Sequence, residues 1–433
     1  MNRTFTLILF SCGLSCAAWA QPQLITWNDN IPSSLKPFQN NANEVAALAK
    51  QQILIYAHPV TNINLPTHKK QPQVKAGFTS AAIVLPVSTE QVIKLLSDYE
   101  HYVGLYPTLK SAKILQQKDQ RSLVQYKISI PTPIPVLNFN ETIVFQHQRD
   151  DRSISSLVID APVPYGLGKF EWFPLEHNQT LLTLTQWGDL NQPKGFVFSK
   201  ILNAVPEAKL GIPSGTGGFI LESIRLRFDK KGPSVLKAGQ FPQDQWTAAQ
   251  LNRIAQVSRA SQQPVSLIHA PTTLPYQHGA EKMRFVTTYH YFPQSSQQLS
   301  KWTQPTLYSK LFPRQLKSVT VQEQNNGAQL ADFKVNLGLG VINIPFNFKL
   351  NFQYPHSHSN SFYAQGGDLK YIKGQMEFNQ HGTGTLLKMT NAAKIDDKAP
   401  FLLRAARSLP YHDLLPTVGA NTVFALKIQA TER

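Results

Sequence analysis

The clearest pattern in the chain is an alternation of apolar and polar positions with a period of two. The polar residues Asn347, Lys349 and Asn351 alternate with four apolar residues: Phe346, Phe348, Leu350 and Phe352. This pattern predicts a strand with one buried and one solvated face, as in an antiparallel sheet. Similar alternation, or short apolar runs bounded by Gly and Asn, predicts further strands at 124–130, 155–161, 169–173 and 180–187.

A second pattern is the helical spacing of apolar residues. Ser88 and Ser295 are each followed by glutamine three residues later, which predicts a capping box at a helix start. After Ser88 the apolar positions recur at helical spacing until Pro107, and Pro313 ends the matching segment: Val92, Leu95, Leu96, Tyr99, Tyr102 and Tyr106. Other segments with helical character are 43–55, 196–205, 217–228, 246–260, 401–409 and 420–430.

These elements recur in the same order about 206 residues apart, which is the mark of an internal repeat. The matches along the chain form an ordered series: Gly104–Ser111 with Lys310–Ser318, Lys127–Ile130 with Lys334–Leu337, Phe145 with Phe352, Gly168 with Gly374, Thr180–Leu182 with Thr385–Leu387, and Pro206 and Pro213 with Pro410 and Pro416. Upstream, Pro59–Val60 is matched with Pro264–Val265. We therefore expect two copies of one unit.

Each copy has the order strand, helix, a run of antiparallel strands and closing helices, which predicts an α+β fold rather than a doubly wound sheet. The predicted organisation has five parts: a signal peptide at 1–20, an N-terminal lead with a helix at 21–73, a first domain at 74–232, a helical linker at 233–280 and a second domain at 281–433.

The N-terminus has the features of a secretory signal peptide. Arg3 supplies a positive charge, Leu7–Phe10 begins a short apolar stretch, and Ala18-Trp19-Ala20 is a small-x-small cleavage site. Cys12, preceded by Ser11, fits a lipoprotein signal only loosely. We expect an exported protein, periplasmic or secreted. Because both cysteines lie in this segment, the mature chain would have no disulfide and no cysteine zinc site.

The chain is basic, with 42 Lys and Arg against 26 Asp and Glu and a net charge of +16. Such a charge favours contact with anionic surfaces, and in an exported protein a membrane or envelope surface is a better candidate than nucleic acid. The alternative is a basic protein whose charge has no dedicated partner. Oligomeric state is not predicted by the sequence.

Residues 85–100 resemble the opening of the SRPBCC superfamily, which includes START lipid-transfer domains, polyketide cyclase-like proteins and coenzyme Q-binding proteins. The resemblance rests on Leu96-Ser97-Asp98-Tyr99 and Leu105-Tyr106-Pro107, whereas the second copy keeps Phe312-Pro313 and has Thr303-Gln304-Pro305 in place of the Asp-Tyr. It implies a START-like, helix-grip fold, in which a curved antiparallel sheet wraps a C-terminal helix around an apolar cavity. The prolines and glycines near 206–218 and 410–419 predict that this closing helix is broken.

Candidate ligand-binding residues follow from the alternation and the resemblance. Aromatic walls with few polar groups suit lipids, quinones or sterols, although aromatic residues at such spacing are more often plain core. The candidates are Tyr102, Tyr106, Tyr126, Phe139, Glu141, Ile143, Phe145, Phe170, Trp172, Phe346, Phe348, Leu350, Phe352, Met376 and Phe378. Glu141 takes the position of Phe348, where an unpaired carboxylate is costly and its pKa tends to rise. It is a candidate acid/base, unless a bulge turns it outward or a cation pairs with it.

Other motifs predict no catalytic or metal centre. His356 and His358 lack a third ligand, Ser214–Gly218 lacks the lysine of a phosphate-binding loop, and Tyr411-His412-Asp413 has no nucleophile beside it. We expect no cofactor and no metal. The leading hypothesis is a non-catalytic carrier or sensor of a hydrophobic molecule in the cell envelope. The alternatives are a cyclase or hydrolase that uses Glu141, and a protein-interaction module with filled cavities.

Overall fold

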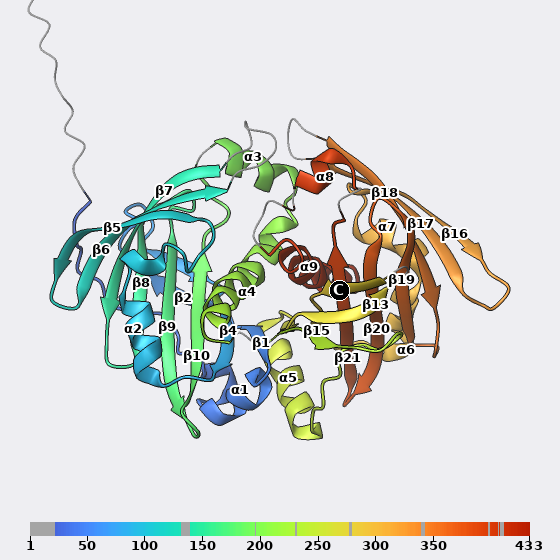
Figure 1. Cartoon of the computed structure of the whole chain (residues 1–433), viewed down its shortest axis with the longest axis horizontal. Coiled ribbons are helices and arrows are strands. Elements are labelled where there is room, and N and C mark those ends of the chain that lie inside the picture. Colours follow the sequence, from blue (N-terminus) through green and yellow to red (C-terminus); the bar gives the residue numbers. More distant parts are fainter. Residues whose placement is uncertain are drawn as a thin grey trace, which may run out of the picture.

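The computed structural model describes residues 22–130, 139–194, 196–229, 232–276, 279–338, 343–396, 399–405, 407 and 411–433 (Figure 1). The first half has these elements in chain order: η1 (Lys36–Phe38), α1 (Ala42–Ala49), β1 (Gln52–Ala57), β2 (Thr61–Asn64), β3 (Gln73–Ala76), β4 (Thr79–Leu85), α2 (Thr89–Ser97), η2 (Glu100–Tyr102), β5 (Leu109–Lys118), β6 (Arg121–Ile130), β7 (Phe139–Arg149), β8 (Ser153–Asp160), β9 (Gly166–Leu175), β10 (Gln179–Gly188), α3 (Phe196–Ala204) and α4 (Ala208–Phe228).

The second half repeats this order, which agrees with the predicted duplication. Its elements are β11 (Ser234–Val235), α5 (Ala248–Ser261), β12 (Val265–His269), β13 (Thr272–Tyr276), β14 (Gly279–Met283), β15 (Val286–Phe292), α6 (Ser296–Leu299), η4 (Ser300–Thr303), η5 (Pro305–Leu307), α7 (Tyr308–Leu311), β16 (Leu316–Glu323), β17 (Gln329–Gly338), β18 (Asn343–Gln353), β19 (Ser359–Gly367), β20 (Tyr371–His381), β21 (Gly384–Lys394), α8 (Phe401–Ala405) and α9 (Leu415–Thr431).

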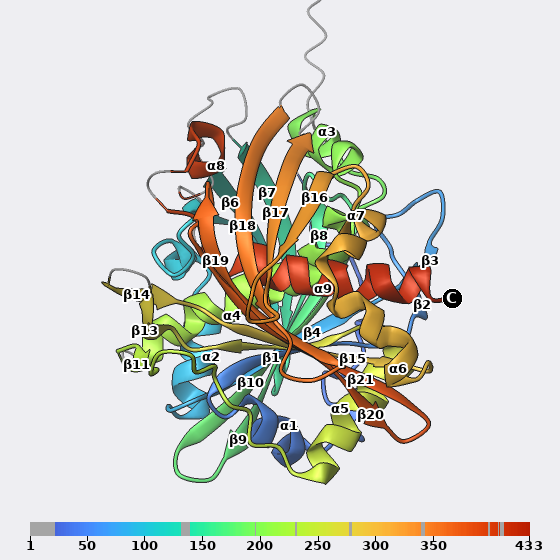
Figure 2. The same ribbon diagram turned by 90° about the vertical axis from the view of Figure 1, so that its right-hand side faces the viewer.

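One antiparallel sheet of 16 strands runs through both halves, in the order β16-β17-β18-β19-β20-β21-β15-β12-β1-β4-β10-β9-β8-β7-β6-β5. The two halves meet where β1 pairs with β12, with Gln52 opposite His269 and Ile55 opposite Ser266. The sheet curves, so that α4 and α9 lie between its two arms while α1 and α5 cover the opposite face (Figures 1 and 2). Each half is therefore an α+β helix-grip unit, as predicted.

The segments before each domain were predicted incorrectly in detail. The helix predicted at 43–55 ends at Ala49, and β1 follows from Gln52, because the run Ile53–Tyr56 is buried on both faces of the sheet. Among the described residues of the predicted helical linker, only Ala248–Ser261 is α-helical, and β12 continues the sheet. The match of Pro59–Val60 with Pro264–Val265 is also wrong, since Val265 begins β12 whereas Val60 lies beyond the end of β1.

The helix after Ser88 is capped as predicted but is shorter. The Ser88 hydroxyl accepts the backbone N–H of Gln91, and the Gln91 side chain accepts the backbone N–H of Ser88. The α-helix ends at Ser97, and the chain continues as a 3-10 turn over Glu100–Tyr102 instead of running to Pro107. Tyr102 is fixed on the concave face of the sheet by its hydroxyl, which donates to the Leu96 carbonyl at 2.7 Å.

The closing helix of the first half is broken, as predicted, between α3 and α4. Pro206 lies in the break, whereas Pro213 is inside α4, where the helix continues. In the second half α8 ends at Ala405 and α9 begins at Leu415, with Pro416 in its first turn.

The glycines of α4 allow it to lie close to its neighbours. A Cβ on Gly211 would lie 2.8 Å from the Gly419 Cα of α9, and a Cβ on Gly218 would lie 2.6 Å from the Ile268 Cδ1 of β12. The glycine-rich segment at 214–218 is thus explained by close packing of α4 against the sheet and α9.

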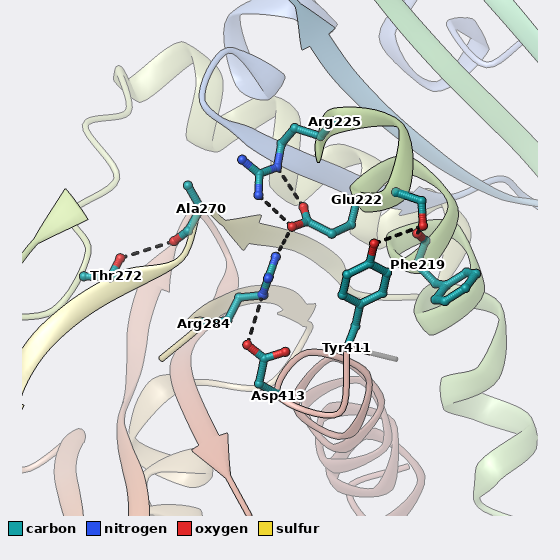
Figure 3. A network of polar contacts seen from close by, with 9 residues as sticks. Phe219, Glu222, Arg225, Ala270, Thr272, Arg284, Tyr411 and Asp413 are labelled. Carbon is teal, nitrogen blue, oxygen red and sulfur yellow. Dashed lines mark hydrogen bonds and ion pairs between the residues drawn. The ribbon is translucent and has the colours of Figure 1, made fainter. Parts of the chain in front are cut away.

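A buried charge network joins the two halves (Figure 3). Glu222 of α4, with 1% of its side chain exposed, accepts two hydrogen bonds from Arg225, at 2.7 and 2.6 Å, and one from Arg284. Arg284 also donates to Asp413 at 3.3 Å and lies over the ring of Tyr411. Burial opposes the charge of Arg284, but the carboxylates of Glu222 and Asp413 together raise its pKa. The network therefore holds α4 to residues of the second half.

Candidate ligand-binding cavity

A cavity of about 490 Å³ lies in the first half, between the concave face of the sheet and α4. Strands β6 to β10 form one wall, and the segment Ile212–Ile220 of α4 forms the other. Most of the lining is aliphatic or aromatic and includes Tyr102, Tyr106, Tyr126, Ile128, Ile143, Phe145, Phe170, Leu184, Trp187, Ile212, Phe219 and Ile220. Among the described lining residues there is no Asp, Glu, Lys or Arg, so the cavity suits an uncharged, apolar molecule.

A chain of three polar side chains crosses the sheet wall of this cavity. The Tyr126 hydroxyl of β6 lies 2.9 Å from Nε2 of His147 in β7, and Nδ1 of His147 lies 2.8 Å from the Ser156 hydroxyl of β8. The ring of Tyr99 stacks on His147 at 4.4 Å, with 12° between the ring planes. Burial lowers the pKa of His147 to about 3, so the imidazole is neutral at physiological pH.

Two other lining groups are already used inside the fold. Gln186 of β10 donates through Nε2 to the Pro213 carbonyl at 3.1 Å and so ties α4 to the sheet. The Thr216 hydroxyl donates to the Ile212 carbonyl one turn earlier in α4, at 2.9 Å. These bonds position the helical wall of the cavity.

The structure brings most of the first-copy candidates to this cavity. Six of them line it: Tyr102, Tyr106, Tyr126, Ile143, Phe145 and Phe170. Trp172 is instead a core residue with 2% exposure. Glu141 is half-buried in β7 but is not among the lining residues. Phe139 begins β7, and its side chain lies outside the described part of the structure.

The sequence reasoning did not find His147, Ser156, Gln186 or the residues of α4. His147 could have been found, because it continues the alternation Ile143, Phe145, 147 on the same face of β7. Ser156 lies opposite His147 in the β7–β8 register, which only the pairing of the strands reveals.

In the second half the corresponding side chains pack against one another. Phe348 stacks on Phe333 at 4.9 Å and on Phe346 at 6.1 Å. Tyr308 contacts Phe352 at 6.3 Å and meets Phe424 of α9 edge-on at 5.1 Å. The remaining candidates of this copy, Leu350, Met376 and Phe378, are buried core residues.

Neither a metal-binding cluster nor a membrane-spanning helix is found among the described residues. They contain no group of three His, Cys, Asp or Glu side chains that could hold a metal ion. No described helix is long and apolar enough to cross a membrane.

No protein-family model and no curated protein matches the chain. Among solved structures, the di-domain ARO/CYC BexL from the BE-7585A biosynthetic pathway is similar over 82% of this chain and 99% of its own, at 10% identity and a TM-score of 0.26. A STAR-related lipid transfer protein from Xanthomonas axonopodis is similar over 41% of this chain and 93% of its own, at 17% identity and a TM-score of 0.28. A START superfamily protein from Mycobacterium smegmatis is similar over 35% and 96%, at 17% identity and a TM-score of 0.26.

These TM-scores are low, so the fold assignment rests on the strand order and helix placement described above. Each half has a curved antiparallel sheet that wraps around its closing helix. The chain therefore has the tandem α+β, helix-grip architecture that its sequence predicted.

Proposed function

We propose that the first half binds one neutral, hydrophobic small molecule and that the protein is a non-catalytic carrier or sensor of that molecule. The observation that carries this proposal is the cavity of about 490 Å³ with no charged residue among its described lining. Ligand pockets commonly have volumes of about 300–1,000 Å³ and mainly apolar walls. At about 30 Å³ per water-sized group, the volume accommodates on the order of 16 non-hydrogen atoms.

The enzyme alternative loses its main support. It required Glu141 to face the bound molecule, but Glu141 does not line the cavity. Burial lowers the pKa of His147 to about 3, far from the pKa near neutral pH that suits a general base. A carrier needs only the apolar enclosure.

Export to the cell envelope is part of the same proposal. It is supported by the N-terminal residues Arg3, Leu7–Phe10 and Ala18-Trp19-Ala20. The net charge of +16 supports contact with an anionic membrane surface, where a hydrophobic cargo would be collected or delivered. Cell fractionation of the full chain tests the location: recovery in the cytoplasm with residues 1–20 intact would contradict export.

Binding is tested by filling the cavity. Ile220→Trp places a larger side chain in the cavity from α4, and Leu226→Trp adds the same bulk to α4 at a position that is 43% exposed. Protein purified from its native host is extracted with organic solvent, and the co-purifying molecules are identified by mass spectrometry. We expect a bound hydrophobic molecule in the wild type and in Leu226→Trp, and its loss in folded Ile220→Trp.

Two outcomes would contradict the proposal. One is wild-type protein that is free of ligand and takes up no lipid, quinone or sterol from a mixed extract. The other is Ile220→Trp protein that retains the same molecule at the same occupancy as Leu226→Trp.

A further inference from the structure

We propose that the chain Tyr126–His147–Ser156 donates one hydrogen bond to a neutral oxygen atom of the bound molecule, and so selects a ketone, quinone or alcohol over a pure hydrocarbon or a carboxylate. This inference rests on the proposed function and specifies the ligand class of the same cavity. The polar chain lies in a mainly apolar wall, and all three of its members line the cavity.

The argument for a donor is a count of hydrogen atoms. Tyr126 and Ser156 each carry one hydroxyl hydrogen, and the neutral ring of His147 carries one N–H. The two bonds within the chain, at 2.9 and 2.8 Å, use two of these three hydrogens. One hydrogen therefore remains for an acceptor outside the chain.

The remaining hydrogen is always on a hydroxyl group, whichever tautomer the ring adopts. If Nδ1 is protonated, it donates to Ser156 while Tyr126 donates to Nε2, and the hydroxyl hydrogen of Ser156 is free. If Nε2 is protonated, it donates to Tyr126 while Ser156 donates to Nδ1, and the hydroxyl hydrogen of Tyr126 is free. In both arrangements the free donor is on a residue that lines the cavity.

The absence of charged side chains from the described lining determines which kind of hydrogen-bond acceptor the cavity can bind. A carboxylate in this cavity would lose its hydration without a cation among the described lining residues to pair with it, which disfavours fatty-acid anions. Burial keeps the imidazole neutral, so His147 does not supply a positive charge either. A neutral carbonyl or hydroxyl oxygen needs only the one donor that the chain supplies.

The second half provides an internal comparison. The strand pairing places Phe333 at the position of Tyr126 and Phe352 at the position of His147. Phe333 stacks on Phe348, and the ring of Phe352 meets that of Phe362 at 5.2 Å. The hydroxyl–imidazole chain of the first half is therefore replaced by packed aromatic rings in the second half.

The test uses three naphthalenes of nearly equal size: 2-acetylnaphthalene, 2-ethylnaphthalene and 2-naphthoate. Their dissociation constants are measured for delipidated full-length protein by fluorescence titration at neutral pH. The ketone preference is defined as the ratio of the constant for 2-ethylnaphthalene to that for 2-acetylnaphthalene. Intrinsic differences in hydrophobicity cancel when this ratio is compared between variants.

Three variants make the hydrogen count testable. Tyr126→Phe and Ser156→Ala each leave one hydroxyl in the chain, so each single variant should keep most of the ketone preference. The triple variant, which adds His147→Phe to both changes, has no donor hydrogen left in the chain, and its preference should fall by about threefold to tenfold. Ser223→Ala is the matched control, because it removes an α4 hydroxyl that donates to the Phe219 carbonyl at 3.0 Å and does not line the cavity. It should leave the preference unchanged.

The outcomes separate the two proposals. Failure of all three naphthalenes to bind the wild type would overturn the proposed function and this inference with it. Binding of 2-ethylnaphthalene with an unchanged ketone preference in the folded triple variant would overturn the inference alone. Binding of 2-naphthoate as tight as that of 2-acetylnaphthalene would do the same. If the triple variant does not fold, equal affinity of the wild type for the ketone and the hydrocarbon decides against the inference, and tighter binding of 2-acetylnaphthalene than of both 2-ethylnaphthalene and 2-naphthoate decides for it.

Discussion

Replacement of Glu222 by glutamine should strongly destabilise the protein, because it removes the negative charge at the centre of the network between the halves. Glu222 is 1% exposed, and its carboxylate contacts both Arg225 and Arg284. An attraction between charges about 4 Å apart is worth about 4 kcal/mol at an effective dielectric constant of about 20. The variant loses two such attractions and leaves two poorly exposed guanidinium groups near each other.

Relaxation of the arginines toward solvent will recover part of this energy. The expected loss in the free energy of unfolding is therefore about 3–5 kcal/mol, the usual result of removing one partner of a buried ion pair. Arg284→Met should lose less, about 1–3 kcal/mol, because Arg225 still neutralises Glu222 and Asp413 is partly exposed.

The measurement is urea unfolding followed by circular dichroism, with the surface pair Lys194–Asp160 as the control. Both side chains of that pair are about 60% exposed, so Lys194→Met should change the free energy by less than about 1 kcal/mol. A loss in Glu222→Gln no larger than that in Lys194→Met would refute the reasoning. A larger loss in Arg284→Met than in Glu222→Gln would refute the assignment of Glu222 as the centre of the network.

Three further predictions concern pH, close packing and the second half. Burial holds three histidines neutral in the folded chain, with pKa values lowered from 6.5 to about 4, 3 and 4: His58, His147 and His290. Below pH 6.5 the histidines of the unfolded chain bind protons that those of the folded chain do not. As the pH is lowered from 6 to 4.5, the free energy of unfolding should therefore fall by up to about 4 kcal/mol per pH unit. A free energy of unfolding in urea that does not change with pH over this range would contradict the prediction. Gly211→Ala should lower stability by about 1–3 kcal/mol, since its Cβ would meet Gly419, whereas Gly232→Ala, which meets nothing within 4 Å, should be neutral in the same thermal unfolding assay. Phe424→Ala should lower the free energy of unfolding by about 2–3 kcal/mol and open space beside Tyr308. Titration with 2-acetylnaphthalene should then show a second binding site. An unchanged stoichiometry would contradict the prediction that the Phe424 ring fills the space of a second site.

Much of the fold could be predicted from the sequence because it depends on local patterns. Alternation in 343–353 and 121–130 sets which face of each strand is buried, and that face is the same wherever the strand pairs. The capping box at Ser88 forms within four residues, so it needs no tertiary partner. The duplication is visible because both copies keep these local signals in the same order.

The errors have a common physical origin in contacts between distant residues. Ile53–Ile55 is predicted to be helical because a fully buried strand lacks alternation, and only its pairing with β4 and with β12, which is more than 200 residues away in the chain, makes it a strand. The break of the helix near Tyr99 likewise depends on packing against His147.

By itself the sequence determined the strand faces, the capped helix start at Ser88, the repeat and the aromatic character of both interiors. Only the tertiary structure decided that the two sheets join into one, that Glu141 lies away from the cavity, and that Tyr126, His147 and Ser156 form one chain. It also decided that Phe424 meets Tyr308 in the second half. The physical reason is that polarity patterns specify which side chains are buried, whereas the space left between them depends on how side chains from distant segments fit together.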